Sequence, residues 1–167
     1  MPSDPADPPR SGRIVEIRLD TDLSRGNSPE LEHERKVAIA DILEDNSFTF
    51  EGAGAVPYRL ALSIRDKRLV IGVSSESGKA LGEHALPLSS FSRLIKDYFI
   101  VCKSYFEAIR TMPPARIEAL DHERRRLHDE GSTLLVERLK SSIQVDFDTS
   151  RRLFTLICAL HWKGEQG

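Results

Sequence analysis

Apolar and polar residues alternate in the first part of the chain in a pattern typical of strands. In residues 13–20 the alternation has a period of two and places Val15, Ile17 and Leu19 on one face. Three runs between residues 58 and 86, YRLALSI, RLVIGVS and ALGEHAL, are rich in β-forming residues and are separated by turn-forming RDK and ESGK. We therefore expect an N-terminal strand and a meander of three antiparallel strands.

Elsewhere apolar residues recur every three or four positions, which predicts helices. The helices are expected from Pro29 to about Asp45, from about Ser89 to the TMPP motif, from about Ala115 to Leu139, and from an N-cap at Asp148 toward the chain end. The helix that begins near Ser89 has the broadest apolar face, so we expect it to be the central buried helix. The last helix is apolar on nearly every side after Arg152 and should also lie in the core.

Together these elements predict an α+β fold class. Residues 142–148 alternate as a late strand, so we expect an antiparallel-rich sheet, made of the three-strand meander plus the N-terminal and late strands, packed with about four helices. The chain of 167 residues has the size of one domain. Its first residues are rich in proline and aspartate, which predicts a disordered tail over residues 1–12 and a single α+β domain over residues 13–167.

Composition narrows the class of protein. Hydrophobic residues make up 40% and charged residues 30%, as in globular proteins, and the net charge of −2 gives no overall attraction for nucleic acid or anionic lipid. No apolar run reaches the ~20 residues of a membrane span, and the first residues do not resemble a secretory leader. We therefore expect a cytoplasmic protein that makes no membrane contact, in which Cys102 and Cys158 are buried free thiols.

Familiar catalytic and metal-binding signatures are absent from the sequence. GAGAVP at 52–57 lacks the third glycine of a dinucleotide loop, and SESGKA at 75–80 lacks the first glycine and the final Ser or Thr of a phosphate loop. There is no GxSxG or CxxC motif. We therefore expect no cofactor and no metal.

One stretch, LDHERRRLHDEGSTLL at residues 120–135, concentrates ionisable side chains on a predicted helix. Asp121 with Arg125, and Arg126 with Glu130, have the spacing of ion pairs on a solvated face. His122 is six positions from the next histidine, so the two cannot share a face and hold one metal ion on a straight helix. Most of this charge is accounted for by a solvent-exposed helix surface.

The apolar stripe of the same helix is interrupted by Arg124 and Gly131. A glycine inside a helix usually marks a break or a close approach of another element. In the last helix, Arg151 and Arg152 occupy the first turn, where cations are unfavourable unless an anion lies nearby. The candidate contacts for a ligand or partner are therefore His128, Glu130, Gly131, Arg124, Arg125, Arg151 and Arg152, with ordinary helix packing as the alternative explanation.

Four segments carry a resemblance to a known family. They are SPELEHERKVAI, IKDYFIVCKSYFEAI, LHDEG and DFDTSRRLFTLICALHWKG, and together they resemble uncharacterised protein family 0262, a family of small bacterial proteins. The similarity covers nearly the whole chain after the proline-rich tail. The resemblance implies a bacterial cytosolic protein, but the family brings no activity, cofactor or catalytic residue.

Two classes of function stay open from the sequence. The favoured one is a non-enzymatic protein-binding or regulatory module that uses helix surfaces to contact a partner or a second copy. The alternative is a small enzyme or anionic-ligand binder in which His128 and Glu130 form an acid–base pair beside arginines. A nucleic-acid role ranks third, because acidic residues flank the arginines at 124–126.

Overall fold

The computed structural model describes residues 12–20 and 29–166. Four strands form one mixed sheet in the order β1-β3-β4-β5, and two short strands, β2 and β6, form a separate antiparallel pair. The strands are β1 Arg13–Leu19, β2 Phe48–Phe50, β3 Pro57–Arg65, β4 Arg68–Ser75, β5 Ala80–Pro87 and β6 Ile143–Val145. Of the predicted disordered tail, only Gly12 falls within these ranges, so the tail stays a prediction.

The predicted α+β class and the meander are confirmed. Strands β3, β4 and β5 pair antiparallel in sequence order, and Asp66 and Lys67 take the left-handed conformation that a tight hairpin turn needs. Two details differ from the expectation. Strand β1 lies parallel to β3, which makes the sheet mixed, and the late strand β6 pairs with β2 outside the main sheet.

Strand β1 carries a bulge that changes which side chains face the core. Its register with β3 shifts between Ile14 and Glu16, and Ile14 is fully buried whereas Val15 is exposed. The prediction that Val15 shares a buried face with Ile17 is therefore wrong, because the extra residue of a bulge reverses the alternation. The Asn46 side-chain amide accepts a hydrogen bond from the Ile14 N–H at 2.7 Å and donates one to the Ile14 carbonyl at 3.0 Å. Asn46 thus replaces a neighbouring strand at this edge of the sheet.

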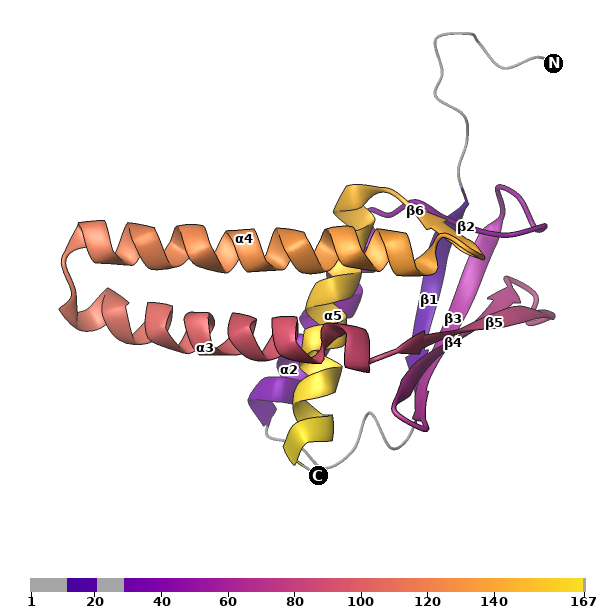
Figure 1. Cartoon of the computed structure of the whole chain (residues 1–167). Coiled ribbons are helices and arrows are strands. Elements are labelled where there is room, and N and C mark those ends of the chain that lie inside the picture. The colour runs from indigo at the N-terminus through magenta and orange to yellow at the C-terminus, as the bar shows by residue number, and fades with distance from the viewer. Residues whose placement is uncertain (1–11, 21–28, 167) are drawn as a thin grey trace, which may run out of the picture.

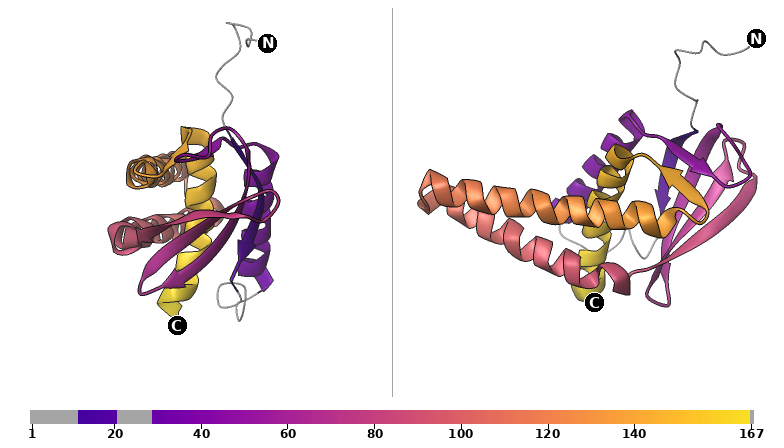
Figure 2. Two further views of the ribbon diagram at one scale, coloured as in Figure 1. Left: turned by 90° about the vertical axis from the view of Figure 1, so that its right-hand side faces the viewer. Right: turned by 45° about the horizontal axis from the view of Figure 1, so that its top comes forward.

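Among the described residues, the last helix, α5, is the one that lies at the centre of the core. The helices are α2 Pro29–Glu44, α3 Ser89–Thr111, α4 Pro114–Leu139 and α5 Phe147–Gln166. Helix α5 packs against both α2 and α4 and buries every residue from Leu156 to Leu160. Figure 2 shows α5 between the α3–α4 pair and α2. The expectation that the last helix lies in the core is confirmed.

Helices α3 and α4 form an antiparallel hairpin, here called the arm, which projects away from the sheet (Figure 1). Only Phe91, Ile95 and Ala108 of α3 are buried, so the expectation that α3 is the central buried helix is wrong. The apolar residues of α3 recur with helical periodicity, but its outer half packs only on α4. Periodicity shows which face of a helix is apolar and not how deeply that face is buried. Both cysteines are free thiols, and Cys158 is buried whereas Cys102 of α3 is half-buried. No helix in the described ranges has the length and apolar character needed to cross a lipid bilayer.

The N-cap of α5 is Asp146, two residues before the predicted cap. The Thr149 N–H donates a hydrogen bond to Asp146 Oδ1 at 2.9 Å, and the Ser150 N–H donates the first helical bond to the Asp146 carbonyl. An N-cap accepts from the third residue of the helix, and Asp146 has this position relative to Thr149. Asp148 lies in the first turn instead and is free to face a cleft.

Replacing Asp146 by alanine should therefore lower the free energy of unfolding by about 1 kcal/mol, because Thr149 loses its acceptor. Urea unfolding of Asp146→Ala and Asp148→Ala measures this directly. Asp148→Ala should change stability by less than about 0.5 kcal/mol, as expected for an exposed residue without a capping bond. A larger loss for Asp148→Ala than for Asp146→Ala would show that the cap is assigned to the wrong residue.

Candidate functional site

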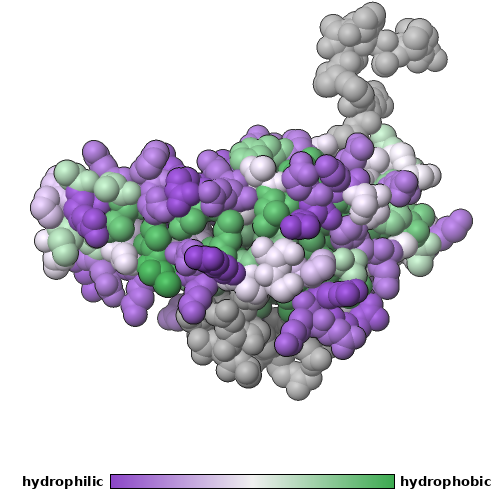
Figure 3. Space-filling view, viewed as in Figure 1, coloured by the Kyte–Doolittle hydropathy of each residue, from purple (hydrophilic) through white to green (hydrophobic). Residues whose placement is uncertain are grey.

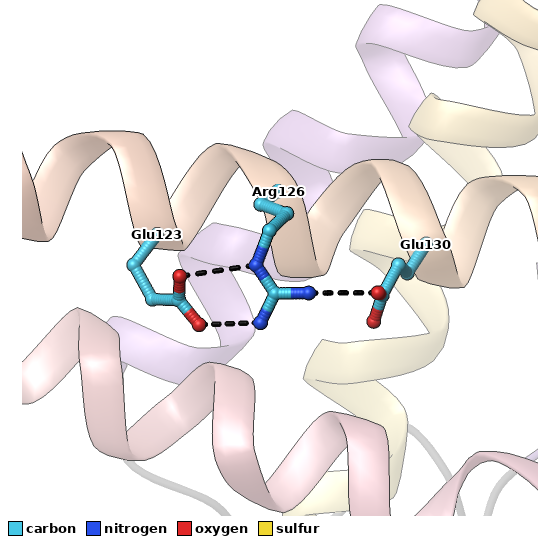
Figure 4. Close-up of polar contacts among 3 residues, drawn as sticks. All are labelled: Glu123, Arg126 and Glu130. Carbon is cyan, nitrogen blue, oxygen red and sulfur yellow. Dashed lines mark hydrogen bonds and ion pairs between the residues drawn. The ribbon is translucent and has the colours of Figure 1, made fainter.

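The ionisable stretch of α4 presents two faces with different surroundings. On the solvent side, Arg126 donates through Nε to Glu123 at 3.0 Å and through Nη1 to Glu130 at 2.7 Å (Figure 4). Glu130 therefore belongs to an exposed ion-pair network and is directed away from α5. The acid–base pair of His128 and Glu130 considered from the sequence is not assembled.

The opposite face of α4 borders a cavity that we call the arginine cleft. Its volume is about 390 Å³, and it lies between α4 and α5 with one side chain contributed by α3. It is lined by Tyr98, Arg124, Arg125, His128, Asp148, Arg151, Arg152 and Thr155. Five of the seven candidate residues thus come together here, from two helices that are distant in sequence. Glu130 and Gly131 do not line the cleft.

The two helices that border the cleft carry the same residue pattern, although Asp121 itself does not line the cleft. Helix α4 carries Asp121-x-x-Arg-Arg-x-x-His128, and α5 carries Asp148-x-x-Arg-Arg-x-x-Thr155. Spacings of three, four and seven residues place all members of each set on one helix face. Sequence reasoning missed Tyr98, Asp148 and Thr155 as cleft residues. The repeated pattern is the signal that could have found the last two, whereas Tyr98 is indistinguishable from a core residue of α3.

Positive charge exceeds negative charge in the cleft wall. Asp148 is the single carboxylate among its described residues, against four guanidinium groups. Arg125 pairs with Asp121 at 3.0 Å, and Arg151 lies 3.6 Å from Asp129. Arg152 donates to the Asp45 carbonyl at 3.0 Å and forms no ion pair with any residue that the structure describes.

Gly131 lies at a close contact between α4 and α5. A Cβ atom added to it would fall 2.2 Å from Cζ of Phe154, whose ring is fully buried. The glycine therefore permits a helix contact and brings His128, one turn earlier, beside α5. The other interruption of the stripe, Arg124, lies with its guanidinium 4.8 Å from the Tyr105 ring centroid and pairs with Asp121.

His128 is held in an aromatic and hydroxyl setting at the inner end of the cleft. Its ring lies 5.5 Å from that of Tyr98 and 5.2 Å from that of Phe154, and Nε2 is 2.8 Å from Thr155 Oγ1. Because Thr155 donates its hydroxyl proton to the Arg151 carbonyl, we assign the Nε2–H of His128 as the donor to Thr155. Nδ1 is buried and has no hydrogen-bond partner in the described part of the chain.

The charge state of His128 follows from this setting. Burial, and then the nearby Arg151 and Arg124, lower the pKa of His128 to about 4, although Asp129 opposes the shift. The imidazole is therefore neutral at pH 7 and adds no positive charge to the cleft. Among the described residues, no group of three or more His, Cys, Asp and Glu side chains is placed to hold a metal ion.

Comparison with known proteins gives the chain a family. The profile of the Uncharacterised protein family (UPF0262) matches residues 11–163. The chain belongs to this family. A UPF0262 protein of Bradyrhizobium sp. (strain ORS 278) is 51% identical over 99% of both chains. Another, of Mesorhizobium japonicum, is 50% identical over 91% of this chain and 94% of its own.

The resemblance seen in the sequence is thus confirmed, and these UPF0262 relatives are bacterial. A third, of Brucella canis, is 49% identical over 95% of this chain and 99% of its own. No solved structure matches this chain significantly. The family name assigns no activity.

Proposed function

We propose that this UPF0262 protein is a binding module whose ligand places a multiply charged anionic group, such as a phosphate or a pair of carboxylates, in the arginine cleft. The observation that carries the proposal is the convergence of four guanidinium groups from α4 and α5 on one cavity of about 390 Å³. Guanidinium groups bind oxyanions in bidentate geometry with charge-assisted hydrogen bonds. The N-terminal turn of α5 adds the favourable end of the helix dipole.

The arrangement also supports a role for His128 in binding rather than in acid–base chemistry. Its neutral imidazole lies beside Arg151 and Arg124, which disfavour its protonation. An anion between these groups would offset their charge and raise the pKa of His128. Binding should therefore take up protons below pH 7 and become tighter as the pH falls toward 5.

Inorganic pyrophosphate is the probe for the cleft, titrated by isothermal calorimetry at low ionic strength. The double variant Arg151→Gln/Arg152→Gln should weaken binding at least about tenfold, because it removes two charge-assisted contacts. The matched control, Arg126→Gln/Arg138→Gln, changes the net charge equally on exposed positions outside the cleft and should alter the affinity less than about twofold. Equal weakening by both double variants would reduce the effect to overall charge and contradict a cleft site.

A second function, protein binding by the arm, is favoured by a separate observation. Four large apolar side chains of the arm, Ile100, Phe106, Ile109 and Met112, are 49 to 63% exposed. On the face seen in Figure 3, hydrophobic surface runs along the arm between hydrophilic margins. Such clusters are unusual on a surface that contacts only water.

The cytoplasmic location expected from the sequence stays a prediction.

A further inference from the structure

Helix α3 carries an apolar stripe with the spacing of a coiled-coil seam. Phe99, Cys102, Phe106 and Ile109 follow one another at intervals of three, four and three residues, and on an α-helix they fall within an arc of about 80°. Phe106 is 63% exposed and Ile109 49%, whereas Phe99 and Cys102 are half-buried. The stripe therefore begins against the body of the protein and is exposed in its outer half.

Basic residues border this stripe. Lys96, Lys103 and Arg110 lie at seven-residue intervals along one edge, all three are exposed, and none forms an ion pair with another described residue. Along the other edge Arg124 of α4 covers the ring of Tyr105. On that edge Asp121 already pairs with Arg124. Glu107 of α3 and Glu34 of α2 are also acidic, and Glu34 lies at the inner end of the stripe. The unpaired charge along the stripe is thus mainly positive.

The inner end of the stripe offers a recess for an anchoring side chain. A cavity of about 410 Å³ is lined by Leu31, Glu34, Phe99, Ile100 and Lys103 and lies between α2 and α3. Three of these residues are apolar, and Lys103 belongs to the basic edge. Interfaces gain most of their binding free energy from a few apolar anchors that fill such recesses.

We propose that this stripe binds one amphipathic helix of a partner protein, with apolar residues in heptad spacing and acidic residues along its edges. The proposal rests on the second function proposed above, protein binding by the arm. Apolar side chains of the partner would cover Phe106 and Ile109, and its carboxylates would face Lys103 and Arg110. Charges beside a coiled-coil seam determine partner choice more than affinity.

The same charges argue against a second copy of this chain as the occupant. In an antiparallel pair of arms, the row of Lys96, Lys103 and Arg110 would face its own counterpart, and like charges at these positions repel. In a parallel pair the row would face the edge formed by Tyr105 and Met112, where the carboxylate of Asp121 is already paired with Arg124 and Arg125. An acidic partner helix satisfies both the apolar stripe and its basic edge.

Two designed helical peptides of about three heptads test the proposal. Both carry leucine and isoleucine at the seam positions; one has glutamate and the other lysine along the edges. Binding of the labelled peptides to the full chain is followed by fluorescence anisotropy at physiological salt. The glutamate peptide should bind at least about tenfold more tightly than the lysine peptide, because its edges attract the basic row whereas lysine edges repel it.

Two variants distinguish the stripe from general charge attraction. Lys103→Glu/Arg110→Glu should reverse the preference between the two peptides. Phe106→Ser should weaken binding of the glutamate peptide about tenfold; because Phe106 is exposed, this variant should keep the circular-dichroism spectrum of the wild type. Equal affinities for the two peptides, no binding at all, or a stable dimer by light scattering that Phe106→Ser dissociates would each overturn the proposal. Pyrophosphate titration of both variants tests the arginine cleft independently of the stripe. The affinity of the cleft for pyrophosphate should stay within about twofold of the wild type.

Discussion

Replacing Gly131 by alanine is expected to lower the free energy of unfolding by about 2 to 3 kcal/mol, a large effect for one methyl group. The added Cβ would lie 2.2 Å from Cζ of Phe154. That ring cannot move aside easily, because it is fully buried and packs near Phe91, Tyr98 and His128. The clash should exceed the gain of about 1 kcal/mol that alanine normally brings to a helix interior. Urea unfolding followed by circular dichroism measures the difference.

Two further variants test whether the loss of stability comes from the clash with Phe154. Thr133→Ala, at an exposed position of the same helix, should leave stability within about 0.5 kcal/mol of the wild type. In the double variant Gly131→Ala/Phe154→Leu the smaller side chain should relieve the clash, so that the two substitutions together cost less than the sum of the two alone. If Gly131→Ala is as stable as Thr133→Ala, the close approach of α4 and α5 does not depend on the glycine.

Stability should depend on pH through His128. Burial and Arg151 lower its pKa to about 4, below the 6.5 of an unfolded chain. Between these values the unfolded chain binds a proton that the native protein does not, so the free energy of unfolding falls as the pH is lowered from 6.5 to 4. After a discount for the partial exposure of the ring, the expected loss is about 1 to 2 kcal/mol.

Chemical unfolding of the wild type and of His128→Gln at pH 7 and pH 4.5 isolates this contribution. Glutamine does not titrate, so the variant should lose less stability on acidification than the wild type. His84→Gln is a useful comparison, because burial also lowers the pKa of His84 and its titration contributes in the same direction. Identical acid losses for His128→Gln and the wild type would mean that His128 is protonated as readily in the folded protein as in the unfolded chain.

Local pattern was sufficient to predict most elements of this fold, but not which elements pack against one another. The meander was predictable because its turns are short and its runs are β-forming. The pairing of β6 with β2 and the bulge of β1 depend on contacts between distant segments, such as Asn46 with Ile14, that no local pattern encodes. For α3, the helix itself was predicted correctly but its position in the core was not. In the sequence, an apolar stripe that packs on one other helix looks the same as a stripe that packs in a core.

The candidate site was predicted in part. Residues such as Arg151, unfavourable in the first turn of a helix, and Arg124, unfavourable in an apolar stripe, were informative because each broke a local rule. Both line the arginine cleft. Glu130 was misleading because a neighbour at helical spacing, Arg126, binds it on the far side of α4.

The arm has the geometry of a lever. Helix α3 has 23 residues and is therefore about 35 Å long, while the contact of Gly131 with Phe154 is made near the base of the arm. Gly131 lies 17 residues, about 25 Å, from the start of α4 at the tip, so a rigid rotation of about 5° at this contact would displace the tip by about 2 Å. His128 and Arg124 lie beside the fulcrum and also line the arginine cleft. A ligand that changes the spacing of α4 and α5 at the cleft would therefore cause a larger displacement at the tip of the arm.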